Sequence, residues 1–133
     1  EDIFPSFLEM AGVKSYHQIG GEIDGVSFLP LLQGQPGSRT DRPLFWHFPN
    51  TYDQPAYSSV RQGDWKLIYY HADRRLELFN VAEDIGEAND RSEENMEVRD
   101  ALAKILSNSL RETNAPMPVD KRSGKPVEYP DQL

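Results

Sequence analysis

The sequence predicts an α+β fold, in which a small four-stranded antiparallel sheet is packed by a long C-terminal helix and preceded by short N-terminal helical segments. Three observations lead to this prediction. Short aromatic and β-branched segments fill the middle of the chain, turn residues separate them, and one amphipathic stripe follows them. A chain of 133 residues has the length of about one domain and can bury a hydrophobic core.

Two short helical pieces are predicted at the start of the chain. Residues 2–13, DIFPSFLEMAGV, have apolar side chains at helical spacing, with Pro5 suited to a first turn and Gly12 to a stop. Residues 26–32, VSFLPLL, form a brief apolar segment that Pro30 keeps short. Polar loops with glycine are expected between and after these pieces.

Four strands are predicted next, each aromatic or β-branched and bounded by turn residues: about 44–48, 56–62, 65–71 and 76–81. Gly63 can supply the positive φ of a tight turn, so the second and third strands should form an antiparallel hairpin. The short link at 72–74 makes the third and fourth strands antiparallel as well.

The third strand is apolar on both of its faces. Side chains alternate along a strand, so Trp65, Leu67 and Tyr69 should lie on one face of the sheet. Lys66, Ile68 and Tyr70 should lie on the other face. Because one helix can cover only one face, the second face is expected to leave apolar surface for a missing neighbour.

A long helix is predicted over about 95–112, with Asp90 or Ser92 as its N-terminal cap. Its apolar stripe comprises Val98, Ala101, Leu102, Ile105, Leu106 and Leu110. We take residues 1–114 as one subdomain. Residues 115–133, rich in proline and charge, are expected to be an extended or frayed tail.

The composition limits which partners and which structural features the chain can have. The net charge is −8, with 14 Lys and Arg against 22 Asp and Glu, which disfavours nucleic acid and anionic membrane surfaces. We find no run of about 18 apolar residues, so no membrane-spanning helix is expected. The absence of cysteine excludes disulfides and thiolate metal sites. The chain begins without Met or a signal peptide, so we expect it to be cut from something longer.

The candidate binding residues lie in the loop after the first strand. His47, Asn50 and Tyr52 combine aromatic and polar groups that suit a sugar ligand, and loops beside strands often carry binding groups. The alternative is that His47 is hydrogen-bonded at the sheet edge. The other histidines, His17 and His71, share no metal-ligand spacing with it, and no metal site is expected in this chain.

Arg61 and Lys66 lie on either side of the turn of the central hairpin. They could form an anion-binding pocket, or they could have a structural role. We expect the second role, with carboxylates or backbone carbonyls as partners near the interface with a missing domain. The candidate carboxylates are Asp64, Glu77 and Asp84.

Five motifs then occur in one order: DIFPSFLEMAGV, IDGVSFLPLLQG, RPLFWHFP, VRQGDWKLI and LELFNVAEDIGEAND. Together they resemble the C-terminal subdomain of the sulfatase family, the type I arylsulfatases of the alkaline phosphatase superfamily. Each motif alone is weak, whereas five in sequence are specific. The resemblance covers about residues 2–112.

The resemblance implies that a longer parent hydrolyses sulfate esters, possibly of carbohydrates. Such enzymes use a formylglycine made from a Cys/Ser-x-Pro-x-Arg motif, and calcium, both in the N-terminal catalytic domain. This chain has no cysteine and its PGSR stretch does not fit that motif, so no catalytic residue is carried over and the chain alone is expected to be inactive. It is expected to buttress the catalytic domain of the same polypeptide and border the substrate cleft.

Two alternatives stay open. The parent could be a related phosphonate or phosphodiester hydrolase or a phosphotransferase, or the chain could be a stand-alone binding or structural domain. A periplasmic or extracellular location of the parent rests on family analogy alone.

Overall fold

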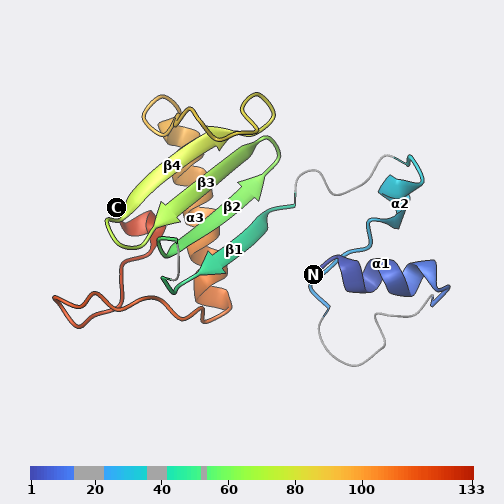
Figure 1. Cartoon of the computed structure of the whole chain (residues 1–133), viewed down its shortest axis with the longest axis horizontal. Coiled ribbons are helices and arrows are strands. Elements are labelled where there is room, and N and C mark those ends of the chain that lie inside the picture. Colours follow the sequence, from blue (N-terminus) through green and yellow to red (C-terminus); the bar gives the residue numbers. More distant parts are fainter. Residues whose placement is uncertain (14–22, 36–41, 52–53) are drawn as a thin grey trace. The chain divides into compact units, whose positions relative to one another are not determined.

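The computed structural model describes residues 1–13, 23–35, 42–51 and 54–133 of the chain (Figure 1). They fall into two units, Glu1–Thr40 and Asp41–Leu133. The first unit contains two short helices, and the second contains a four-stranded sheet and a long helix. The predicted α+β fold is confirmed.

The first unit is held together by polar contacts at the start of helix α1 (Ile3–Met10). The Ser6 hydroxyl donates to the Asp2 carbonyl at 2.6 Å and accepts the Phe28 N–H at 2.9 Å, just before helix α2 (Leu29–Leu32). The Asp2 side chain accepts the Val26 N–H at 3.0 Å. A Cβ at Gly25 would lie 2.2 Å from the Glu1 carbonyl oxygen, so this close approach of two backbone segments requires glycine.

The sheet has the strand order β1-β2-β3-β4, and every neighbouring pair is antiparallel. The strand bounds lie within one residue of the prediction: β1 Leu44–Phe48, β2 Tyr57–Gln62, β3 Trp65–Tyr70 and β4 Arg75–Asn80. Gly63, with φ of 58°, forms the β2–β3 turn as expected.

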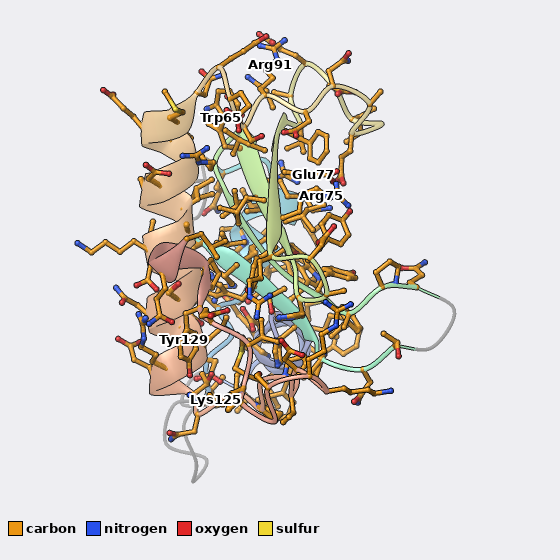
Figure 2. All side chains as sticks on the ribbon, turned by 90° about the vertical axis from the view of Figure 1, so that its left-hand side faces the viewer. Trp65, Arg75, Glu77, Arg91, Lys125 and Tyr129 are labelled. Carbon is orange, nitrogen blue, oxygen red and sulfur yellow. The ribbon has the colours of Figure 1, made fainter. Side chains whose placement is uncertain are left out.

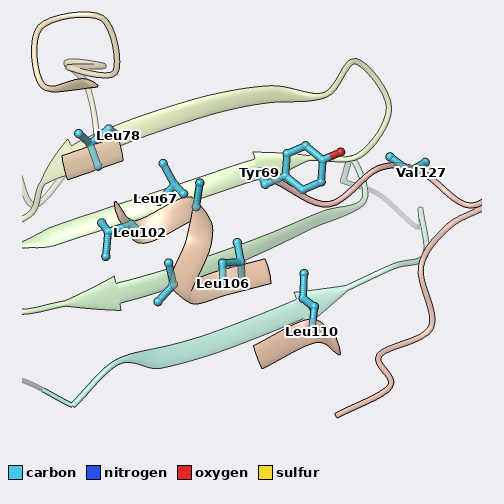
Figure 3. Packing of buried hydrophobic residues seen from close by; sticks show 9 residues of the cluster. Leu67, Tyr69, Leu78, Leu102, Leu106, Leu110 and Val127 are labelled. Atoms are coloured by element: carbon cyan, nitrogen blue, oxygen red, sulfur yellow. The ribbon is translucent and has the colours of Figure 1, made fainter. Parts of the chain in front are cut away.

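Helix α3 (Met96–Glu112) lies across one face of the sheet (Figure 1). Leu102, Leu106 and Leu110 pack there against Leu67 and Leu78 (Figure 3). The predicted stripe differs in one member, because Ala101 is exposed whereas Ala103, which was not predicted, is buried.

The predicted cap of this helix is wrong. The residue before the first turn of α3 is Asn95, and no side chain caps it. Asp90 accepts hydrogen bonds from the Leu78 and Ser92 N–H groups at 3.0 and 2.9 Å instead. The Arg91 N–H donates to the Leu78 carbonyl at 2.8 Å, so residues 90–91 close the outer edge of β4.

Residues 115–133, called the tail below, follow an extended path but are not frayed. Val119 and Pro126 form an isolated antiparallel bridge, and Val127 joins the core beside Tyr69 (Figure 3). The Tyr69 hydroxyl donates to the Glu128 carbonyl at 2.7 Å. Tyr129 lies beside α3, and a short 3-10 helix (Pro130–Gln132) ends the tail (Figure 2). The sequence did not predict this packing, because the tail contributes single side chains to the core and has no periodic apolar face.

Among the residues described, no helix combines the length and the apolar character that a membrane crossing requires.

Candidate functional site

A hydrogen-bonded chain of two histidines and a serine joins β1, β2, the end of β3 and the tail. Nδ1 of His47 lies 2.7 Å from the Ser58 hydroxyl, which lies 3.0 Å from Nε2 of His71. Nε2 of His47 lies 3.2 Å from the Pro116 carbonyl oxygen. Ser58 and His71 are buried, whereas His47 is half-buried.

The Pro116 carbonyl fixes the direction of these hydrogen bonds when both histidines are neutral. A carbonyl only accepts, so His47 donates from Nε2 and accepts the Ser58 hydroxyl at Nδ1. Ser58 then accepts from Nε2 of His71, and Nδ1 of His71 is left as a buried acceptor with no hydrogen-bond partner among the described residues.

His71 is held neutral at ordinary pH. Burial lowers the pKa of His71 to about 4, and the nearby His47 adds to this, against a smaller opposing effect of the Tyr57 backbone. Burial favours the neutral ring, because a charged ring here would be desolvated and no carboxylate among the described residues pairs with it.

Next to His71 lies a groove of about 640 Å³, called the tail groove below. One wall comes from the loop after β1, with Asn50 and Thr51. The other wall comes from the tail, with Lys121 and Arg122. Its remaining lining residues are Pro49, Ala56, His71, Ala72, Arg74, Pro118, Val119, Asp120 and Val127.

Arg74 anchors the tail to the β3–β4 turn, where its own backbone has a φ of 60°. Its guanidinium donates to the carboxylate of Glu128 and, at 3.4 Å, to that of Asp120. The hydrogen bond from Arg74 lowers the pKa of Glu128. The pKa of Asp120 is lowered by the hydrogen bond from the Arg122 N–H and, to a smaller extent, by Arg74. Both carboxylates are therefore charged at neutral pH. The positive charge of Arg74 is therefore already balanced within the chain.

Of the residues predicted for substrate binding, the structure describes His47 and Asn50, which have different surroundings. Asn50 is exposed and lines the tail groove, whereas both ring nitrogens of His47 are engaged in hydrogen bonds. Tyr52 lies outside the described residues. Sequence reasoning missed His71, Lys121 and Arg122, because the groove forms only when the tail docks, and its one sequence signal is the charged turn DKRSGK at 120–125.

The hairpin cations make contacts of their own. Arg61 donates from Nε to the Gly63 carbonyl at 3.3 Å. Lys66 pairs at 2.6 Å with Glu87, a carboxylate that was not among the three candidates, and both side chains are half-buried. The loop that contains Glu87 folds back over β3, which the strand pattern did not indicate.

The second face of the sheet, opposite α3, carries a row of stacked side chains. In register across the four strands lie Phe48, Tyr57, Tyr70 and Arg75. The ring centroids of Phe48 and Tyr57 are 5.2 Å apart, those of Tyr57 and Tyr70 are 6.5 Å apart, and the Arg75 guanidinium lies 4.3 Å from the centroid of Tyr70. Arg75 also pairs with Glu77 on the same strand (Figure 2).

Much of the apolar surface of each unit is open to solvent. Phe48 is 51% exposed and Trp46 is 40% exposed on the second face of the sheet. In the first unit, Phe7 is 63% exposed and Leu32 is 65% exposed. Surfaces of this kind mark interfaces with other protein segments.

The described residues offer no group of three His, Cys, Asp or Glu side chains that could hold a metal ion. Calcium therefore finds no ligand set in this part of the chain, and no catalytic step is assigned to it.

A curated sulfatase of Formosa agariphila is 32% identical over 142 aligned positions, which cover 97% of this chain and 26% of the relative. The structure of BT4656 in complex with its substrate D-glucosamine-2-N,6-O-disulfate matches with a TM-score of 0.65 at 23% identity, covering 86% of this chain and 24% of that protein. The chain thus spans about a quarter of the length of these relatives.

A phosphonate monoester hydrolase, SpPMH from Silicibacter pomeroyi, also matches, with a TM-score of 0.51 at 19% identity over 97% of this chain and 28% of that protein. At such identities the two solved structures show a shared fold and nothing more. The family is shown by a different match: the model of the N-sulphoglucosamine sulphohydrolase C-terminal family covers residues 1–115. This chain belongs to that family and is a C-terminal sulfatase subdomain, as its five ordered motifs indicated.

Proposed function

We propose that this chain completes an enzyme that hydrolyses sulfate esters, by supporting the catalytic domain and bordering its substrate cleft. The observation that carries the proposal is the family match over residues 1–115 of a chain that spans 26% of its curated relative. The reaction itself belongs to the upstream domain of the longer polypeptide. Formylglycine as nucleophile and calcium as electrophile are expected there.

The exposed apolar surfaces support the buttressing role. Helix α1 presents Phe7, and the second face of the sheet presents Trp46 and Phe48. Covering such side chains removes apolar area from water, at about 25 cal/mol per Å². A catalytic domain of the same polypeptide is the partner that this proposal assigns to them.

The loop after β1 is proposed to lean toward the substrate, with His47, Asn50 and Tyr52 as its contributors. Asn50 is exposed and lines the tail groove, where its side chain could contact a ligand directly. His47 would act indirectly, by holding the loop in place, since its ring nitrogens are hydrogen-bonded to Ser58 and Pro116. Alanine at each of the three positions in the full-length enzyme should raise KM for the sulfated substrate. Unchanged kinetics in all three variants would reject this role of the loop.

The enzymatic part of the proposal is tested by sulfate release. The full-length polypeptide should release sulfate from D-glucosamine-2-N,6-O-disulfate or a related sulfated sugar, and a change of its Cys/Ser-x-Pro-x-Arg nucleophile to Ala should abolish release. This chain alone should release none. Sulfate release by the chain alone would overturn the assignment of the chemistry to the upstream domain.

The phosphonate or phosphodiester hydrolase alternative shares the fold, as the likeness to SpPMH illustrates. The same assay distinguishes it when a phosphonate monoester is offered beside the sulfated sugar. Faster turnover of the phosphonate would favour the alternative.

A further inference from the structure

We propose that the tail groove is a binding site for a sulfated saccharide, in which Lys121 and Arg122 contact a sulfate group. The choice of a sulfated sugar as ligand rests on the proposed function. The site itself rests on the geometry of the tail and on its charges.

The tail holds the two cations in an ordered turn. The Asp120 N–H donates to the Lys125 carbonyl at 2.9 Å, and the Gly124 N–H donates back to the Asp120 carbonyl at 2.8 Å. The Asp120 carboxylate accepts the Arg122 N–H at 2.8 Å. Gly124, with φ of 68°, permits this turn. These hydrogen bonds fix the backbone of the turn that carries Lys121 and Arg122.

These two cations differ from Arg74, which also lines the groove. Arg74 is balanced by Asp120 and Glu128. The side chains of Lys121 and Arg122 make no ion pair or hydrogen bond with any residue in the described parts of the chain. Two adjacent unpaired cations, in a chain with a net charge of −8, are free to receive an anion. The guanidinium fork of an arginine matches two oxygens of a sulfate group.

The remaining lining suits the sugar ring. Val119 and Val127 give the groove apolar surface, and Asn50 and Thr51, which also line it, carry an amide and a hydroxyl. Small-molecule sites combine apolar walls with a few polar groups in this way, within about 300–1,000 Å³. Inorganic sulfate would use the cations but none of these other groups, so the groove should distinguish a sulfated sugar from the free ion.

The experiment is calorimetric titration of the 133-residue chain with three probes: D-glucosamine-2-N,6-O-disulfate, unsulfated D-glucosamine and sodium sulfate. We expect the disulfate to bind and the other two to bind at least about tenfold more weakly, which corresponds to about 1.4 kcal/mol. The double variant Lys121→Ala/Arg122→Ala should weaken disulfate binding by about tenfold or more. Both residues are exposed, so the fold should be kept, and circular dichroism checks this.

The matched control is Lys104→Ala/Lys125→Ala, which removes the same charge at two exposed lysines that do not line the groove. It should bind the disulfate as the unchanged chain does. Histidine NMR gives a second readout, because a bound anion should raise the pKa of His71, which borders the groove.

Four results would overturn the proposal: no binding of the disulfate, equal binding of sodium sulfate, equal binding of D-glucosamine, or equal losses in the two double variants. Sulfate release by the full-length polypeptide together with any of these would leave the proposed function intact and reject the groove alone. Binding in the groove without sulfate release by the full-length polypeptide would reject the function instead.

Discussion

Arg111 and Asp131 form a bidentate ion pair, in which Nη1 and Nη2 of the guanidinium each lie 2.7 Å from one carboxylate oxygen. The pair joins the last turn of α3 to the short helix that ends the tail. The Asp131 N–H also donates to the Ser107 hydroxyl at 3.0 Å, and the Arg111 guanidinium stacks 4.4 Å from the Tyr129 ring centroid.

Asp131→Asn should loosen the end of the tail with little effect on the sheet, because the pair is partly exposed and such pairs are weak. Limited proteolysis should cut faster after Lys121, Arg122 or Lys125 in the variant. Asp100→Asn is the control, because Asp100 pairs with Arg99 inside the same helix, α3. Equal proteolysis rates in wild type and Asp131→Asn would contradict this role.

Tyr69→Phe should destabilise the chain by about 1 kcal/mol, since it removes the hydrogen bond to the Glu128 carbonyl and keeps the buried ring. Urea unfolding measures the change. Tyr70→Phe, on the other face of the sheet, should have a smaller effect. Burial raises the pKa of the Tyr69 hydroxyl to about 12, and an absorbance titration can follow this change.

His71 should make folding sensitive to acid. Its pKa is about 4 in the folded chain against 6.5 ordinarily, so between these values the unfolded chain binds more protons. Stability should fall as pH drops from 6.5 to 4, by at most about 1.4 kcal/mol per pH unit. His71→Gln keeps a hydrogen-bonding group near Ser58 but cannot titrate. Unfolding curves over this range should show a shallower pH slope for the variant, and identical slopes would refute the assignment.

Phe48→Ser tests the second face of the sheet. In the 133-residue chain the change should leave the thermal midpoint nearly unaltered, because Phe48 is already 51% exposed and its ring contact with Tyr57 lies at the surface. In the full-length polypeptide the same change should lower the midpoint, because the buried interface would receive a polar group. A midpoint that is equally insensitive in both proteins would show that this face is not an interface.

Lys66→Gln and Arg61→Gln test whether the central hairpin holds an anion. Lys66 is paired with Glu87 and Arg61 contacts the Gly63 carbonyl, so the full-length enzyme should keep its KM for a sulfated substrate in both variants. A several-fold rise in KM, or a sulfate bound between the two side chains, would contradict their structural role.

The sheet and the long helix could be predicted from sequence because each carries its own period and its own turn residues, such as Gly63. The tail groove could not be predicted. Its walls come from residues 49–51 and 118–122, which no local pattern connects, and they meet only because Val127 and Tyr69 bring the tail to the sheet. The loop that holds Glu87 was missed for the same reason, since its pairing with Lys66 is a tertiary contact.

The closure of β4 by Asp90 and Arg91 has a consequence for how the sheet can grow. Leu78, at the middle of β4, already gives its N–H and carbonyl to this loop, so an incoming strand finds that side blocked. β1 pairs only with β2 in the described chain, and its five residues, LFWHF, include neither proline nor a charged side chain that would repel a further strand. Any extension of the sheet, by another segment of a longer polypeptide or by a second copy during expression, would therefore proceed from the β1 side alone.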